Sequence, residues 1–191
     1  MGAVTLTSDW PSANGPMTVA DLDRTPDDGR RYELVDGVLV VSPAPFIPHQ
    51  VVLGELEYVL RAALPDDLAI IPGVGLRMSD STELVPDLVV ARRDDLAGPR
   101  LTRPPLLAVE VRSRSTALFD LNIKKVVYER HGIDSYWIVV PDRDEPAITA
   151  FELTDGLYQL ACHSAGDEEF RAVQPFAVTI VPSRLVAWLR G

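Results

Sequence analysis

Two acidic residues within apolar stretches are the part of this chain best suited to chemistry. Asp87 lies in LVPDLVVA, Glu110 lies in LLAVEV, and the helical stretch that follows carries Lys124. A buried ionised carboxylate is costly unless a cation or another partner balances its charge. Mg²⁺ prefers oxygen ligands and is usually held by one or two carboxylates together with a substrate phosphate. The pattern therefore favours a divalent-cation site, with Mg²⁺ or Mn²⁺ held by Asp87 and Glu110.

The spacing of the two acids allows them to meet on neighbouring strands. They are 110 − 87 = 23 residues apart, which leaves room for a loop between two adjacent strands. On the predicted helix, Lys124 follows Asp120 by four residues, so both lie on one side. The same spacing is also that of a plain surface ion pair, worth about 0.3–0.5 kcal/mol. Spacing alone therefore does not assign Lys124 to the site.

The elements that must position these residues form an α/β pattern. A short helix is predicted at 17–25, and RYELVDGVLVV predicts a hairpin that turns at Asp36-Gly37, a dipeptide suited to positive φ. Apolar residues recur at helical spacing from Val51 to Leu64. Three runs rich in Val and Leu predict strands of a buried sheet: LAIIPGVGLRM, LVPDLVVA and LLAVEV.

The second half of the chain continues this pattern. Residues 117–131 predict a helix that ends at Gly132 and packs an apolar side on the sheet, made of Phe119, Ile123, Val126 and Val127. SYWIVVP predicts a strand, and the strand–helix–strand order predicts a right-handed crossover between parallel strands. A hairpin at Thr154-Asp155-Gly156, the strand FAVTIVP and a short terminal helix follow. We predict a disordered segment over 1–16 and a single domain over 17–191.

Composition limits the class of protein. With 191 residues, of which 47% are hydrophobic, the chain can bury a sizeable core in one domain. Its apolar runs are well short of the roughly 20 residues of a membrane helix, and the N-terminus lacks a basic leader. We therefore expect a cytoplasmic protein without membrane association. Cys162 is the only cysteine, which excludes a disulfide framework and a cysteine-based zinc cluster.

Net charge argues against nucleic-acid binding, but its distribution is uneven. The chain carries a formal charge of −10, which repels phosphate at long range. Between Arg92 and Arg130 there are nine bases and five acids, a local charge of 9 − 5 = +4. The remainder has nine bases and 23 acids, or −14. The bases therefore gather around the candidate site in sequence, although this could also be ordinary surface patchiness.

A series of short motifs runs over roughly residues 17–160: YELVDG, His49-Gln50, Pro86-Asp87, Glu110-Val111 with Ser113 and Ser115-Thr116, Asp120-Leu121 with Lys124 and Tyr128, and Gly132 with Tyr136-Trp137-Ile138-Val139. In order and spacing these motifs resemble those of the Uma-two family of restriction-endonuclease-like proteins in the PD-(D/E)xK nuclease superfamily. The resemblance implies an α/β (α+β) fold with a restriction-endonuclease-like core. Its central mixed β-sheet would be flanked by helices, with additional N-terminal and C-terminal β-hairpins.

The resemblance also implies a Mg²⁺-dependent phosphodiesterase site. Asp87 and Glu110 would bind the metal, and the carbonyl of Val111 would add a ligand. Lys124 would orient or activate water. The basic residue of the superfamily normally stands two positions after the second acid, where this chain has Arg112. Arginine stays protonated and cannot act as a general base, so Arg112 is predicted to contact phosphate.

Four further residues receive predicted roles. Glu33 resembles an additional site carboxylate, and the alternative is a strand residue that faces outward. His49 precedes the helix predicted from Val51 and would either contact phosphate or merely flank that helix. Asp120 is assigned to the substrate side of the site, with a surface ion pair to Lys124 as the alternative. Tyr128 is predicted to pack in the core.

Three functions are left open by the sequence. They are a metal-dependent DNA endonuclease, an RNA or single-strand nuclease, and a catalytically weak module that binds nucleic acid or another partner. The trio Asp87, Glu110 and Lys124 favours an enzyme, whereas the charge of −10 favours the binding module. Cutting both strands of a duplex would favour a two-fold homodimer. No recognition helix or zinc module is visible, so no recognition sequence is predicted.

Overall fold

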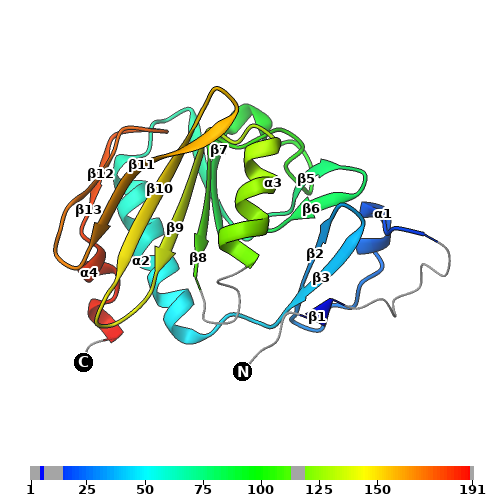
Figure 1. The fold of residues 1–191 in the computed structure, drawn as a ribbon, viewed down its shortest axis with the longest axis horizontal. Helices are drawn as coiled ribbons and strands as arrows, with labels where there is room; N and C mark the ends of the chain where they lie inside the picture. Colours follow the sequence, from blue (N-terminus) through cyan, green and yellow to red (C-terminus); the bar gives the residue numbers. More distant parts are fainter. Residues whose placement is uncertain (1–4, 7–14, 113–118, 190–191) are drawn as a thin grey trace.

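A six-stranded mixed β-sheet forms the centre of the fold in the computed structural model, which describes residues 5–6, 15–112 and 119–189, with the backbone alone for 5–6 and 119–121. Its strand order is β11-β10-β9-β8-β7-β4 (Figure 1). The strands are β4 (Leu68–Pro72), β7 (Leu88–Arg92), β8 (Leu107–Val111), β9 (Ser135–Val140), β10 (Ala147–Thr154) and β11 (Leu157–Ala165). As predicted, β8 and β9 are parallel, while the other neighbours are antiparallel.

A second sheet carries the N-terminal hairpin and has the order β1-β3-β2-β6-β5. Its strands are β1 (Thr5–Leu6), β2 (Arg31–Val35), β3 (Val38–Ser42), β5 (Leu76–Ser79) and β6 (Thr82–Leu84). The turn between β2 and β3 has positive φ at Asp36 and Gly37, 48° and 82°, as a type I′ hairpin requires. The predicted hairpin is therefore confirmed. The prediction of a disordered segment over 1–16 falls largely outside the described residues, apart from β1, which pairs with β3.

Two apolar runs that each predicted one strand are divided between the two sheets. The chain leaves the central sheet after β4 at Gly73, whose φ of 58° suits glycine, and enters the second sheet at Leu76. Between β6 and β7 lie Pro86 and Asp87, because proline cannot donate to a strand ladder. Asp87 therefore precedes β7, which corrects its predicted place inside a strand.

Helices cover the two faces of the central sheet. Helix α2 (Ile47–Ala63) buries Val52, Leu56 and Leu60 on one face, and begins four residues earlier than predicted. Pro48 permits this start because the first turn of a helix does not need its N–H group. On the other face lie the π-helical turn η2 (Phe119–Lys124) and α3 (Lys125–Arg130), which ends before Gly132 as predicted.

Shorter elements complete the fold. Helix α1 (Val19–Leu22) begins after Thr18, whose N–H and hydroxyl both donate to Asp21 at 2.8 Å. The C-terminal hairpin of β10 and β11 turns at Asp155-Gly156 with φ of 52° and 79°, and it extends the central sheet. The remaining elements are η1 (Arg93–Asp95), β12 (Phe170–Ala172), β13 (Val178–Ile180), α4 (Pro182–Leu185) and η3 (Ala187–Leu189). None of the helices in the described part of the chain is long and apolar enough to span a membrane.

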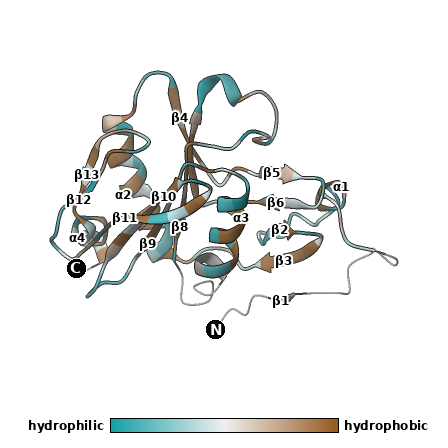
Figure 2. Cartoon of the chain, turned by 45° about the horizontal axis from the view of Figure 1, so that its top comes forward, coloured by the Kyte–Doolittle hydropathy of each residue, from teal (hydrophilic) through white to brown (hydrophobic). Residues whose placement is uncertain are grey.

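Successive residues of the central strands face two separate cores. In β7, Leu88 and Val90 pack on the side of α2, whereas Val89 packs with Tyr128 on the side of α3. Figure 2 shows the central strands as predominantly hydrophobic. In β8, Val109 faces the α2 core, so the next residue, Glu110, faces α3. Sheet alternation therefore aims this acid at the helix that carries Lys124.

Helix α3 turns a different side toward the sheet than predicted. Ile123 and Val126 are 44% and 57% exposed, whereas Lys124 is 2% exposed. The buried side consists of Lys124, Val127 and Tyr128, at positions i, i+3 and i+4. The segment starts as a π-helix, whose wider turn changes which residues face the sheet. The predicted apolar side is therefore wrong for Ile123 and Val126.

Candidate active site

The candidate site lies at one edge of the central sheet, where β7 begins and β8 ends. Leu88 pairs with Val109 in these antiparallel neighbours, and Asp87 and Glu110 lie one step beyond that pair. Figure 1 shows the end of β8 at the lower edge of the sheet, close to the start of α2 and to η2. The topology therefore brings both acids to one place, together with residues from two helices.

Asp87 accepts three hydrogen bonds. Its Oδ1 accepts from Nη1 of Arg31 at 2.7 Å, and its Oδ2 accepts from Nε2 of His49 at 2.9 Å and from the N–H of Val111 at 2.8 Å. Burial alone would raise the pKa of Asp87, but the hydrogen bond from His49 and the charge of Arg31 outweigh it and hold the pKa well below its usual range. Asp87 is therefore an ionised carboxylate, and His49 carries its proton on Nε2.

Glu110 and Glu33 share Lys124. The ammonium Nζ lies 2.9 Å from Oε1 of Glu110 and 3.0 Å from Oε1 of Glu33. Glu110 also accepts from the hydroxyl of Tyr128 at 2.7 Å, and Glu33 accepts from the N–H of Val85 at 2.7 Å. All three charged side chains are about 98% buried. Lys124 therefore bridges two buried carboxylates that come from different sheets.

A comparison with family models decides the family. The model described as "Putative restriction endonuclease", Uma2, matches residues 19–181. The chain belongs to the Uma2 family. Uma2 membership places it among restriction-endonuclease-like nucleases, in agreement with the motifs read from the sequence.

One solved structure resembles the Uma2 chain over nearly its whole length. It is described as a putative nuclease belonging to DUF820 from Anabaena variabilis ATCC 29413. The TM-score is 0.71 at 16% sequence identity, and the match covers 91% of this chain and 99% of that chain. At this identity the likeness shows the fold alone, and it confirms the predicted α/β class with a restriction-endonuclease-like core. A search of curated proteins finds no match.

The structure separates the alternatives for several predicted site residues of this Uma2 chain. Glu33 is 1% exposed, so it does not face outward. His49 lies in the first turn of α2, not before the helix as predicted, and it contacts Asp87. Lys124 is buried, so it does not form the exposed surface ion pair that was the alternative prediction. Tyr128 packs in the core as predicted, and its hydroxyl also reaches Glu110.

Other predicted site residues are not brought into the cluster of buried charges. Arg112 is half-buried, and its backbone N–H donates to the carbonyl of Val139 at 2.7 Å. Within the described ranges its side chain forms no ion pair. The side chain of Asp120, like the motif residues Ser113, Ser115 and Thr116, lies outside the described residues.

Sequence reasoning missed two residues of the cluster, Arg31 and the hydroxyl of Tyr128. Arg31 stands two positions before Glu33 in β2, so strand alternation places both on one face. That spacing was the available signal. Burial raises the pKa of Tyr128 well above its usual range, and the charges of Glu110 and Glu33 raise it further. Tyr128 is therefore a neutral hydrogen-bond donor.

The acids of the cluster suit a divalent cation in chemical type but are engaged by basic side chains. Among the described residues, no group of three or more His, Cys, Asp and Glu side chains is arranged to hold a metal ion. The carboxylates of Asp87, Glu110 and Glu33 are nevertheless the hard oxygen donors that Mg²⁺ prefers. Counting the three carboxylates against the two bases Arg31 and Lys124, the formal charge is −3 + 2 = −1. The donors and the residual negative charge therefore fit a cation.

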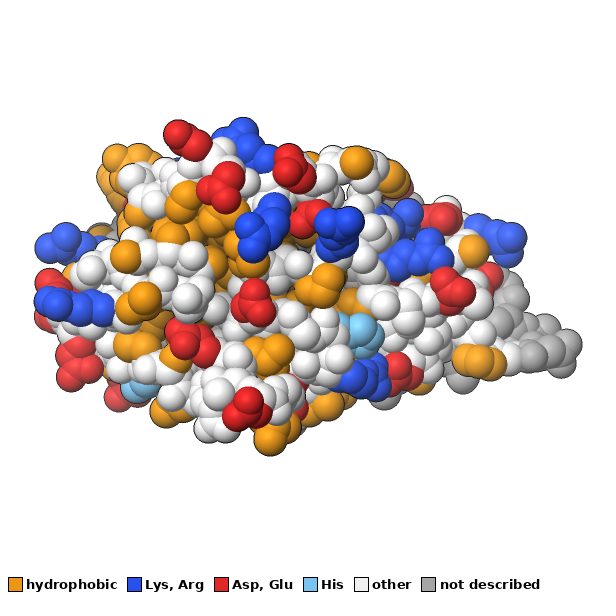
Figure 3. Space-filling model, turned by 90° about the horizontal axis from the view of Figure 1, so that it is seen from above, with side chains coloured by type: hydrophobic (Ala, Val, Ile, Leu, Met, Phe, Trp, Pro, Cys, Tyr) orange, Lys and Arg blue, Asp and Glu red, His pale blue; other side chains and the backbone are white. Residues whose placement is uncertain are grey.

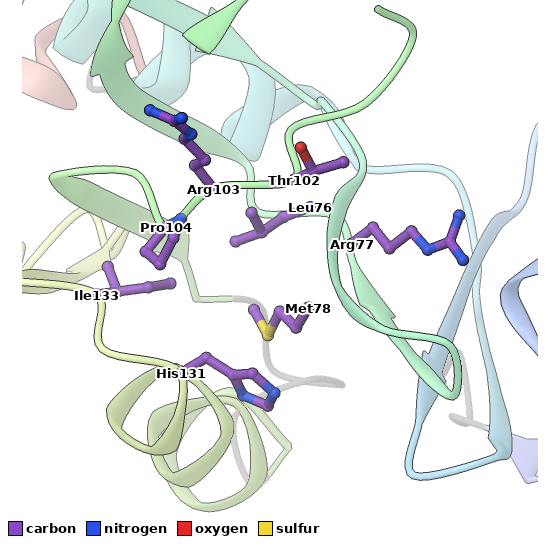
Figure 4. A pocket seen from close by; sticks show the side chains of 8 residues that line it. All are labelled: Leu76, Arg77, Met78, Thr102, Arg103, Pro104, His131 and Ile133. Carbon is purple, nitrogen blue, oxygen red and sulfur yellow. The ribbon is translucent and has the colours of Figure 1, made fainter.

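Two hollows at the surface of the described part of the chain lie away from this cluster. One of about 100 Å³ is lined by Leu76, Arg77, Met78, Thr102, Arg103, Pro104, His131 and Ile133. Figure 4 shows the guanidinium groups of Arg77 and Arg103 pointing away from each other, outward from the apolar floor. On the face seen in Figure 3, basic side chains are interspersed with acidic ones. We find no continuous basic patch on that face that would mark a nucleic-acid path.

Proposed function

We propose that this Uma2 protein is a divalent-cation-dependent endonuclease that hydrolyses phosphodiester bonds of DNA. The observation that carries the proposal is the buried cluster in which Asp87, Glu110 and Glu33 converge on Lys124 and Arg31. Burying several charges is expensive, and structures that retain them commonly use them for function. Family membership supports nuclease chemistry, while the substrate and metal are our inference.

Asp87 and Glu110 would hold Mg²⁺ or Mn²⁺, with the carbonyl of Val111 as a further ligand. When bound, such a cation lowers the pKa of a coordinated water and offsets charge on a phosphoryl oxygen. The cluster charge of −1, a divalent cation and one phosphodiester charge sum to −1 + 2 − 1 = 0. The assembled site would therefore be neutral, which supports binding of an anionic substrate in a buried place.

The surrounding side chains hold the acids in position. The N–H of Val111 and His49 fix Oδ2 of Asp87, and Lys124 and Tyr128 both donate to Oε1 of Glu110. Lys124 would also orient an attacking water, because its ammonium lies between two carboxylates. Nδ1 of His49 is buried without a hydrogen-bond partner among the described residues. With the proton on Nε2, Nδ1 is an acceptor, so a contact between His49 and a phosphate oxygen would need a bridging water.

The catalytically weak binding module has one observation in its favour. Arg31 and Lys124 already neutralise the acids that a metal would use. If these pairs persisted in the presence of Mg²⁺, the fold would bind nucleic acid without cleaving it. The net charge of −10 would also slow the approach of DNA.

A plasmid cleavage assay tests the proposal. Supercoiled DNA is incubated with the purified chain and Mg²⁺ or Mn²⁺, with single-stranded DNA and RNA in parallel. We expect nicking that requires the metal and disappears in Asp87→Ala. Glu57→Ala is the matched control, because Glu57 pairs with Arg61 on the outer side of α2. Cleavage that persists with a chelator or in Asp87→Ala contradicts the proposal. Cleavage of RNA but not DNA would show that the substrate is RNA.

A further inference from the structure

Arg31 occupies the oxygen of Asp87 that a cation would most readily use. Oδ2 of this carboxylate already accepts from His49 and Val111, two donors that do not depend on Arg31. Oδ1 has Nη1 of Arg31 as its partner within the described ranges, at 2.7 Å. The accessible coordination position on Asp87 is therefore the one that the guanidinium covers.

Arg31 is also the cation of the cluster that is able to leave. Its side chain is 25% exposed, whereas that of Lys124 is 2% exposed and lies between two carboxylates. The other contact of Nη1 is the carbonyl of Val85 at 3.2 Å, which water can replace. A movement of Arg31 toward solvent therefore breaks one ion pair, whereas a movement of Lys124 would leave two buried acids uncompensated.

A divalent cation on Oδ1 would compete with the guanidinium for that oxygen. Mg²⁺ binds carboxylate oxygens at about 2.0–2.1 Å, so a metal on Oδ1 would lie next to a positive group now 2.7 Å from the same atom. Like charges at such separation repel strongly in a site with little water. Once displaced, the guanidinium remains beside the site and can pair with two phosphate oxygens.

We propose that Arg31 is a positioning residue that occupies Oδ1 of Asp87 until a divalent cation displaces it, and that it then contacts the substrate phosphate. This inference rests on the proposed function. It explains why the described structure pairs the acids with bases, and it assigns a regulatory role to β2 at the metal site. Arg31 then sets the metal concentration at which the nuclease becomes active.

Mn²⁺ binding without nucleic acid tests this role. Binding is measured by electron paramagnetic resonance of free Mn²⁺ for the full chain, Arg31→Gln and Arg31→Lys. We expect Arg31→Gln to bind Mn²⁺ roughly threefold to tenfold more tightly, because a competing cation is gone, and to cleave DNA more slowly. Arg31→Lys keeps the charge and should stay within about threefold of wild type. Arg130→Gln is the matched control, because Arg130 pairs with Asp36 at 2.8 and 3.2 Å, away from Asp87.

The outcomes separate this inference from the proposed function. Unchanged or weaker Mn²⁺ binding in Arg31→Gln, with wild-type binding intact, contradicts the displacement of Arg31 by the cation and leaves the proposed metal site unaffected. A tightening that Arg130→Gln reproduces also overturns it, because a general field effect would then suffice. Mn²⁺ binding by Arg31→Gln, without binding by the wild type, supports the displacement of Arg31. If neither wild type nor Arg31→Gln binds Mn²⁺, both proposals fail. Circular dichroism and thermal unfolding check that each variant folds.

Discussion

Lys124 and Glu33 join the helix on the central sheet to a strand of the second sheet through a buried ion pair of 3.0 Å. Each side chain is 2% exposed. The same ammonium holds Glu110 at 2.9 Å, so one lysine balances acids from both sheets. The stability of the fold therefore depends on a lysine that also belongs to the candidate site.

Replacement of Lys124 should therefore destabilise the protein severely. Lys124→Met leaves Glu33 and Glu110 without their cation, and breaking a buried pair of this kind costs about 3–5 kcal/mol. Urea unfolding measures the loss. The neighbouring Lys125→Met is the control, because Lys125 lies 4.1 Å from the centre of the Phe151 ring and should cost about 1 kcal/mol or less. Similar losses for the two variants would contradict the shared role of Lys124.

Tyr128 and Tyr158 offer a test of positioning. Tyr128→Phe removes the hydroxyl that donates to Glu110 at 2.7 Å, and should lower kcat about tenfold with little change in KM, because the acid loses one of its fixing contacts. Tyr158→Phe removes a buried hydroxyl that donates to the carbonyl of Ile133 instead. It should cost about 1 kcal/mol of stability and leave kcat unchanged. Steady-state kinetics and urea unfolding distinguish the two; equal kcat values would exclude a role for Tyr128 in orienting Glu110.

Asp87 should contribute stability that depends on pH. Its pKa is held below that of an unfolded chain, about 3.9, because His49 and Arg31 outweigh the effect of burial. Its stabilising contribution is therefore complete above the unfolded pKa and is lost as the pH falls below that value toward the folded pKa. The stability difference between wild type and Asp87→Asn should shrink between about pH 5 and pH 2.5 in urea unfolding. A difference that is constant over this range would contradict the depressed pKa.

Two glycines at equivalent hairpin turns should differ in their tolerance of alanine. Gly37 and Gly156 have φ of 82° and 79°, so a side chain strains both by about 1–2 kcal/mol. A Cβ on Gly37 would lie 2.5 Å from Cβ of Pro16, whereas nothing lies within 4 Å of a Cβ on Gly156. Gly37→Ala should therefore be the more destabilising, as measured by thermal unfolding. Equal losses of thermal stability in the two variants would show that Pro16 moves away from the added Cβ without a loss of stability.

The sequence predicted those parts of the fold that local chemistry controls. Both hairpins were found at Asp36-Gly37 and Asp155-Gly156 because these dipeptides accept positive φ. The division of LAIIPGVGLRM between two sheets was not predictable, since a run of apolar residues does not say which sheet will bury it. The exposure of Ile123 and Val126 was missed for a related reason: the π-helical turn shifts the buried side of α3.

The acids of the site were easier to find than their partners. Glu110 stood out because a charge in an apolar strand requires an explanation. Arg31 and Asp87 are 56 positions apart, and Tyr128 and Glu110 are 18 apart, so no short motif joins either pair. The approach of β2 brings Arg31 to Asp87, and the packing of α3 on the central sheet brings Tyr128 to Glu110. The metal and the roles in catalysis stay predictions.

The short connection from β6 to β7 has a consequence for how small a working version of this protein could be. Its backbone at Val85 donates to Glu33 and accepts from Arg31, and two residues later the chain supplies Asp87. Charged groups of the two sheets therefore meet beside this connection. A shortened protein without the first hairpin would lose Arg31, the base that pairs with Asp87, and Glu33, the second acid that pairs with Lys124. The smallest unit that holds the complete cluster is therefore both sheets together.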